Sequence, residues 1–212
     1  MVERRLLKSL KEENTDLKLD LSQSKDQNRR LWSVIKALNE LECNLHTIST
    51  SGHLLDMIMD ILSIALEAVE SENGSILLLD EETDELVFVT VVGDRQDELT
   101  GYRIPAESGV AGWVNRTRRS ALVPNVRKDD RWISAVDQSV GFHTRSLMAV
   151  PLVLGERVLG VMEIVNALPE KNFNEKDLAL IQLVARLASF VFGCTEEALE
   201  KGPDPLADEN LN

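Results

Sequence analysis

The sequence has few of the residues that hold disulfide-bonded or metal-dependent folds together. Only two cysteines, Cys43 and Cys194, occur among its 212 residues. Two are too few for a disulfide framework, a four-thiolate zinc site or an iron–sulfur cluster. No apolar run approaches the roughly 20 residues of a membrane span, and the N-terminus lacks the apolar core of a signal peptide. We therefore expect a cytoplasmic protein with no membrane association and no metal site.

Positive charge is also scarce. The net charge of −13 argues against nucleic-acid binding, because phosphate contacts need clustered Lys and Arg. Residues 103–145 depart from this balance, with eight basic and four acidic side chains. If this segment lines a binding site, its charge favours a small anionic ligand.

Proline is absent from residues 1–50, where Leu and Ile recur at alternating steps of three and four. This spacing predicts a long helix that dimerises as a parallel coiled coil. Two asparagines at a positions would pair across the interface and fix its register. The predicted dimer interface comprises Asn14, Leu17, Leu21, Asn28, Leu31, Ile35 and Leu38. A shifted seam after Leu38 and a single solvated helix are the alternatives.

The body of the chain, residues 52–193, predicts an α+β fold. A helix begins near Gly52 and ends at Asn73-Gly74, and a hairpin follows over residues 75–92. After an irregular middle, Gly155-Glu156 joins two strands, 146–154 and 157–165, and Asn174 caps a final helix. This order indicates an antiparallel sheet flanked by helices. Residues 195–212 are acidic and lack periodicity, which predicts a disordered tail.

Four segments in this order resemble a GAF domain: GVAGWV (109–114), LVPNVRKDDRW (122–132), residues 141–166 and residues 173–189. The resemblance covers about 52–193. It implies a central antiparallel sheet of about six strands with a small-molecule pocket on one face, roofed by the middle loops. The first and last helices would cover the other face, and in this family they commonly form a parallel dimer.

These motifs supply the candidate site residues. An Arg could hold a phosphate, while hydroxyl groups would form a polar minority in an apolar pocket. The candidate ligand-binding residues are Arg127, Asp129, Thr144, Arg145, Ser146, Glu163 and Asn166, and the pocket-shaping ones are Gly109, Gly112, Trp113, Phe173 and Asp177. Packing in the core, or a solvated loop, is the alternative role for several of them. Glu163 either faces the pocket and accepts hydrogen bonds from a base edge, or faces water.

Phosphodiesterase GAF domains that bind cyclic nucleotides carry an Asn-Lys, Phe, Asp-Glu signature. Asn166, Phe173 and Asp177 match it, whereas Ala167 and Leu178 depart from it. The departure removes the Lys–Asp ion pair at the edge of the pocket. A cyclic nucleotide is therefore a weakened candidate ligand, and no cofactor is required.

The residues do not predict catalysis. Cys43 falls on the N-terminal helix and Cys194 follows the last helix, away from the middle loops where family members use pocket thiols. His143 alone is a weak haem or metal signal. We expect a non-catalytic, bacterial-type signal-transduction sensor, a homodimer that relays ligand binding through helix packing to a separate output protein. The alternatives are a ligand-free dimerisation scaffold and an enzyme of the sulfoxide-reductase type.

Overall fold

The computed structural model describes residues 10, 11, 13–22, 24, 25, 28, 51–168 and 171–201, without the side chains of 51–55 and 194–201. The described residues between 10 and 28 are helical, and Leu17 and Leu21 are exposed there. Asn14 and Asn28 are themselves helical. Leu31, Ile35, Leu38 and Cys43 lie outside the described residues, so the parallel dimer stays a prediction.

Six strands form one antiparallel sheet in the order β3-β2-β1-β6-β5-β4. The two predicted hairpins are confirmed. The strands are β1 (Ser71–Asp80), β2 (Glu85–Val92), β3 (Arg103–Pro105), β4 (Ala121–Val123), β5 (Leu147–Leu154) and β6 (Arg157–Ala167). Both central strands, β1 and β6, alternate their side chains between the two faces of the sheet.

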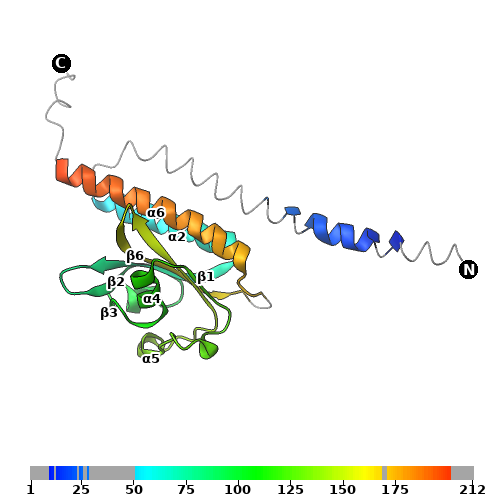
Figure 1. The fold of residues 1–212 in the computed structure, drawn as a ribbon, viewed down its shortest axis with the longest axis horizontal. Coiled ribbons are helices and arrows are strands. Elements are labelled where there is room, and N and C mark those ends of the chain that lie inside the picture. The colour runs from blue at the N-terminus through cyan, green and yellow to red at the C-terminus, as the bar shows by residue number, and fades with distance from the viewer. Residues whose placement is uncertain are drawn as a thin grey trace, which may run out of the picture.

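Two long helices, α2 (Ser51–Val69) and α6 (Glu175–Lys201), pack side by side on one face of the sheet (Figure 1). The apolar positions of α2 recur at helical spacing and are buried against β1, β2 and α6. Ser189 in α6 accepts a hydrogen bond from the Val153 N–H at 2.9 Å, which fastens α6 to β5. The predicted arrangement of the first and last helices on one face is therefore confirmed.

The start of α6 is capped as the sequence predicts. The Asn174 side chain accepts from the Lys176 N–H at 2.9 Å, and Asp177 accepts from the Asn174 N–H at 3.0 Å. This reciprocal pair satisfies backbone donors that the first turn of a helix leaves open. Phe173, just before the cap, is buried in the core under α2 and α6.

The C-terminal ends of α2 and α6 both differ from the prediction. α2 ends at Val69 rather than at Asn73-Gly74, because Glu70 turns the chain at a φ of 55° and β1 begins at Ser71. Gly74 marks a close approach instead, since a Cβ there would meet the Glu163 carbonyl oxygen at 2.9 Å. α6 runs to Lys201, so Cys194 lies within it and residues 195–201 are helical. This stretch is rich in Glu, Ala and Leu, which favour helix; residues 202–212 lie outside the described part.

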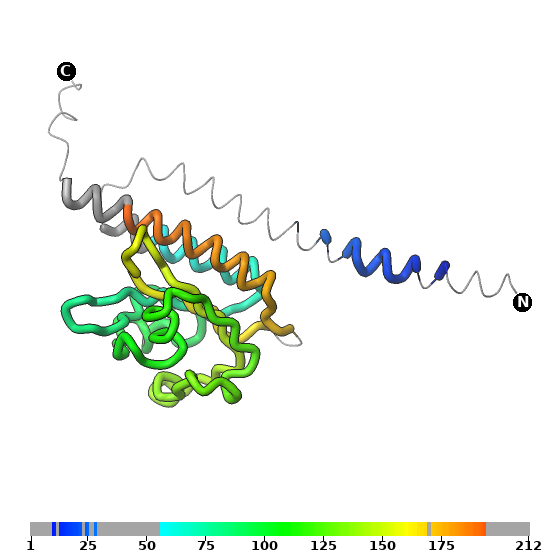
Figure 2. The backbone as a smooth tube through the Cα atoms, viewed as in Figure 1, coloured from blue at the N-terminus to red at the C-terminus, as the bar shows by residue number. Residues whose placement is uncertain are grey.

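The opposite face of the sheet is covered by short elements from the predicted irregular middle. They are α3 (Gln96–Leu99), α4 (Gly109–Thr117), the 3₁₀ turn η2 (Val126–Lys128) and α5 (Ala135–Val140). Figure 2 follows their backbone below the sheet, away from α2 and α6. None of the helices in the described ranges is both long and apolar enough to cross a membrane.

Candidate ligand-binding cavity

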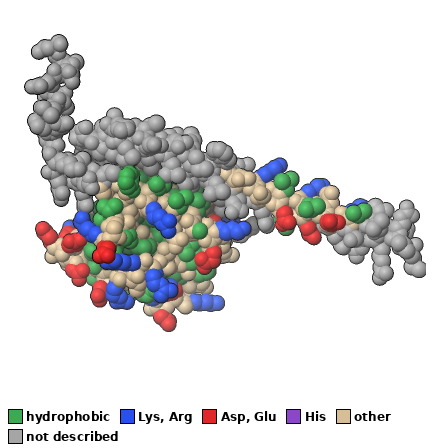
Figure 3. Space-filling view, turned by 45° about the horizontal axis from the view of Figure 1, so that its top comes forward, with side chains coloured by type: hydrophobic (Ala, Val, Ile, Leu, Met, Phe, Trp, Pro, Cys, Tyr) green, Lys and Arg blue, Asp and Glu red, His purple; other side chains and the backbone are tan. Residues whose placement is uncertain are grey.

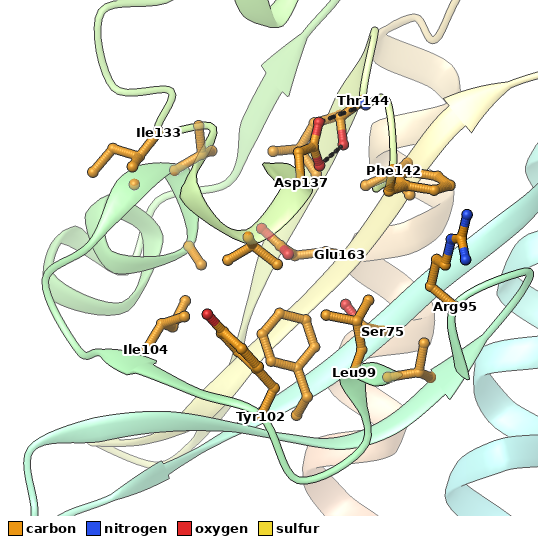
Figure 4. A pocket seen from close by; sticks show the side chains of 18 of the residues that line it. Ser75, Arg95, Leu99, Tyr102, Ile104, Ile133, Asp137, Phe142, Thr144 and Glu163 are labelled. Atoms are coloured by element: carbon orange, nitrogen blue, oxygen red, sulfur yellow. Dashed lines mark hydrogen bonds between the residues drawn. The ribbon is translucent and has the colours of Figure 1, made fainter. Parts of the chain in front are cut away.

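A cavity of about 230 Å³ lies between the sheet and the short elements α3, α4 and α5 (Figure 4). Strands β1, β2 and β6 form its floor, and α5 with its flanking loops forms its roof. Its walls are mainly apolar and include the rings of Phe88, Tyr102, Trp132 and Phe142. An apolar cavity with a few inward polar groups is the usual form of a small-molecule site.

Glu163 lies on β6 at the cavity floor, so the open question of its direction is answered by the fold. The neighbouring side chains of Met162 and Ile164 point to the opposite face and pack in the helix-side core. Figure 4 shows the Glu163 carboxyl at the centre of the cavity. Glu163 is half-buried, and its carboxyl faces the cavity (Figure 4).

Burial raises the pKa of Glu163 to about 7, and the nearby Asp137 carboxylate adds to the shift. Burial acts because a charged carboxylate loses solvation inside the protein, while a second negative charge further favours the protonated form. Within the described part of the chain, no group donates a hydrogen bond to the Glu163 side chain. The cavity therefore holds one carboxyl that is free to meet a ligand.

Asp137 projects from α5 and fixes the loop that leads into β5. Its two oxygens accept hydrogen bonds from the Thr144 N–H and the Thr144 hydroxyl, each at 2.8 Å (Figure 4). Thr144, a predicted ligand-binding residue, lines the cavity with its hydroxyl engaged in this way. The pair holds α5 over the cavity.

Arg95 closes one end of the roof. Its guanidinium pairs with Glu98 at 3.2 Å and donates to the Gly141 carbonyl at 3.4 Å, joining the segment before α3 to the end of α5. Its Nε is buried and has no acceptor among the residues that the structure describes. Arg95 therefore bridges two roof segments that are far apart in the sequence.

Arg145, Ser146 and Asn166 lie together beside the cavity but do not line it. The Asn166 side chain accepts from the Arg145 N–H at 2.7 Å and donates to the His143 carbonyl at 2.9 Å. Asn166 itself has a φ of 58°, a conformation that Asn adopts more readily than most residues. Arg145 donates to the carbonyl of Ala167 at 3.4 Å. These residues join the end of β6 to the start of β5.

Arg127 and Asp129 also lie outside the cavity lining. Arg127 is exposed on η2. Asp129 forms a bidentate pair with Arg131, with N–O distances of 2.8 and 2.7 Å. This pairing lowers the pKa of Asp129 and raises that of Arg131. The Arg131 guanidinium lies 4.3 Å from the centre of the Trp113 ring, so these groups form a surface stack on α4.

The two predicted glycines shape the start of α4. Gly109 lines the cavity at a φ of 66°, which favours glycine. Gly112 packs against the backbone of Glu107, where a Cβ would meet the carbonyl carbon at 2.1 Å. Gly112, Trp113, Phe173 and Asp177 are not part of the lining. They support the surrounding fold through α4 and the α6 cap.

The basic segment 103–145 does not gather in the cavity. Of its eight basic side chains, only Arg103 is in the lining, and its guanidinium pairs with Asp80 and Glu85, each at 2.9 Å. On the face seen in Figure 3, Lys and Arg side chains are interspersed with Asp and Glu. The segment's excess charge is therefore spread over the surface rather than concentrated at the site.

Sequence reasoning missed several residues that face the cavity, among them Ser75, Arg95, Tyr102, Asp137 and Phe142. A signal existed for Ser75, which opens an otherwise apolar strand run, and for Tyr102, the single tyrosine of the chain. Asp137 and Phe142 gave none, because no periodic pattern marks the short α5. Among the described residues, no group of three or more side chains could hold a metal ion.

Comparison with curated proteins gives partial matches to cyclic-nucleotide phosphodiesterases. The chain is 36% identical over 73 residues to the cone cGMP-specific 3',5'-cyclic phosphodiesterase subunit alpha' of Bos taurus, covering 34% of this chain and 8% of that protein. It is 28% identical over 125 residues to the corresponding Gallus gallus subunit, covering 57% of this chain and 14% of that one. The chain therefore spans only a small part of these relatives' length.

Solved structures share the fold over most of the chain. The GAF domain of a phosphoenolpyruvate-protein phosphotransferase from Coxiella burnetii matches with a TM-score of 0.66 and 15% identity, covering 78% of this chain and 96% of that one. The free methionine-R-sulfoxide reductase from Neisseria meningitidis matches with a TM-score of 0.58 and 21% identity, covering 72% and 86%. The GAF domain family model matches residues 53–192. Because this match includes more than half of the chain, the protein belongs to the GAF domain family.

Proposed function

We propose that this GAF domain senses a small molecule bound in the cavity and transmits its presence to the helix pair α2 and α6. The observation that carries the proposal is the open, mostly apolar cavity on the face of the sheet opposite those helices. Binding that favours one arrangement of the roof over another would shift the population of the linked helix arrangements.

Strand β6 offers a physical route between the two faces. Glu163 faces the cavity, while its neighbours Met162 and Ile164 are fully buried against the helix side. A ligand that moves β6 at Glu163 therefore acts directly on the packing under α2 and α6. In the proposed dimer, the N-terminal helices would carry this change to a separate output protein.

We propose that the module is not catalytic and needs no cofactor. Among the described residues that line the cavity there is no Cys or His, so these residues offer neither thiolate chemistry nor a histidine base. Cys194 lies on α6, and that helix packs against the other face of the sheet. These placements support sensing over a reaction of the sulfoxide-reductase type.

The relatives' names make cGMP a candidate ligand for this chain. The matching signature residues have structural roles here: Asn166 joins two strand ends, Phe173 fills the core and Asp177 caps α6. Ala167 and Leu178 replace the remaining signature positions. The signature therefore gives little support to a cyclic nucleotide as the ligand. The basic side chains of residues 103–145 lie on the surface rather than in the cavity, so they give little support to an anionic ligand.

The experiment is native mass spectrometry of the full chain, purified gently and compared with denatured samples. We expect a dimer that carries a stoichiometric small mass, lost on denaturation. Leu99→Trp, which fills the cavity beside α3, should abolish that mass, whereas Glu82→Trp on the exposed β1–β2 turn should retain it. A ligand-free chain from every preparation would favour the scaffold alternative, and a monomer would contradict the coiled-coil prediction.

A further inference from the structure

The charged side chains that line the cavity almost all have hydrogen-bond partners within the protein. Arg95 pairs with Glu98, and Arg103 pairs with Asp80 and Glu85. The oxygens of Asp137 accept both donors of Thr144. Glu163 is the one charged lining residue whose whole side chain lacks a partner in the described ranges, whereas Arg95 keeps only its buried Nε without an acceptor. The floor of the cavity, at Glu163, therefore lacks hydrogen-bond donors that a ligand could supply.

Two hydroxyl groups share the cavity interior with Glu163. Ser75 is its cross-strand neighbour on β1, and Tyr102 lies on the opposite wall (Figure 4). Neither hydroxyl has a hydrogen-bond partner in the part of the chain described. Each can donate or accept, so they suit a ligand's polar edge without adding charge.

The remaining walls favour a flat ligand. Phe88 and Tyr102 meet edge to face, with ring centres 6.3 Å apart, and Phe142 and Trp132 bound the cavity under the roof. Aromatic faces attract cations and stack on planar groups. An anion, by contrast, would meet the Glu163 carboxyl, while both described Arg side chains of the lining are already paired with carboxylates.

We propose that the cavity takes a small, planar ligand of neutral or positive charge, whose N–H groups donate to Glu163. This rests on the proposed sensing function and narrows its ligand class to amidine-like, amine or amide-like groups. The protonated carboxyl offers one donor and one acceptor, which suits an amide edge. The ionised form accepts only, and suits a cation.

The proposal carries a pH dependence. Asp137 on α5, Arg95 before α3, and Tyr102 and Arg103 at β3 are the other ionisable groups lining the cavity. Because the pKa of Glu163 is raised to about 7, its charge develops between pH 6 and 8. A cation should therefore bind more tightly at pH 8 than at pH 6, while a neutral amide should change little.

The test uses three fragments of one shape: benzamidine, benzamide and benzoate. Their dissociation constants for the full chain are measured by ligand-observed NMR at pH 6 and pH 8. We expect benzamidine to bind at least about tenfold more tightly than benzoate at pH 8. Glu163→Gln should weaken benzamidine by about tenfold and leave benzamide within about twofold. Glu156→Gln, on the exposed β5–β6 turn, is the matched control and should change neither.

Benzoate binding as tightly as benzamidine overturns the ligand class, and so does full benzamidine affinity in Glu163→Gln. Either result leaves the sensor proposal intact, because a ligand still occupies the cavity. The comparison in the unmodified chain stands even if Glu163→Gln fails to fold. Failure of all three fragments, with no ligand in the native mass spectra, overturns both proposals.

Discussion

The two faces of the sheet differ in how completely their side chains fill space. The helix face holds a continuous core of mostly aliphatic residues, and most of its members are no more than 2% exposed. The cavity face has a smaller core, rich in Val and Ala, and leaves about 230 Å³ open. Since burial of apolar surface drives folding, the helix face supplies most of the stability and the cavity face can carry function.

The contrast is built into single strands. Along β6, fully buried Met162 and Ile164 face the helices, while Glu163 between them faces the cavity. This arrangement follows from strand geometry, because successive side chains of a strand point to opposite faces of the sheet. A change on the cavity face therefore reaches the helix face without passing through any loop.

Truncating one leucine to alanine on each face of the sheet gives the largest expected difference in the free energy of unfolding. Leu62→Ala removes a side chain with 0% exposure from the helix face and should lower the free energy of unfolding by about 2–5 kcal/mol. Leu99→Ala trims a half-buried side chain beside an existing cavity and should cost about 1 kcal/mol or less. Urea denaturation measures both, and equal losses would contradict the division between the faces.

We expect the ionisation of Glu163 to lower the free energy of unfolding of the protein as the pH rises. Its pKa in the folded protein is raised to about 7 from an ordinary 4.5, so the folded state holds this proton more firmly than the unfolded state. The stabilisation is full below pH 4.5 and is lost as pH rises to about 7. The loss amounts to about 3 kcal/mol.

Glu163→Gln should remove this loss, so the difference between variant and unmodified chain should grow from pH 5 to pH 7.5 and then level off. Urea denaturation across that range gives the difference directly, since the other carboxyls cancel. Glu156→Gln should track the unmodified chain throughout. A pH-independent difference for Glu163→Gln would mean that the carboxyl is solvated in the folded state.

The sequence predicted the regular parts of this molecule well. Apolar periodicity identified α2, α6 and both hairpins, and the cap of α6 was predicted from Asn174 with Asp177 three positions later. The failure at Asn73-Gly74 has a clear cause. Such a pair is a turn signal by composition, but Gly74 serves here to let β1 approach β6 closely. Composition alone cannot separate these two uses of glycine.

The candidate site was harder to predict because its residues come from many separate strands, short helices and loops. Thr144, Glu163 and Gly109 were identified from motifs and line the cavity, whereas Arg127 and Arg145 lie outside it. The motif segments contain residues that line the cavity and residues that lie outside it. Only the fold determines which of their side chains face the cavity. Asp137 lies in the short α5 and Arg95 directly before the short α3, and neither helix shows an apolar periodicity that could indicate these residues.

The smallest expected effect concerns the roof rather than the floor of the cavity. Asp137→Asn replaces one acceptor oxygen with an amide group that cannot accept from Thr144. We expect a loss of about 1 kcal/mol, appearing mainly as local opening of α5, because few buried contacts hold that helix. Hydrogen exchange over residues 135–144 should quicken, while exchange in α2 should be unchanged.

The same substitution should also lower the pKa of Glu163, because it removes the nearby negative charge that contributes to the shift. Burial remains the larger cause, so the pKa should stay above 4.5. An NMR titration of the Glu163 carboxyl measures this, with Asp97→Asn on exposed α3 as the control. If hydrogen exchange in α2 quickens together with that in α5, the two faces unfold as one unit. The independence of roof and helix pair would then be wrong.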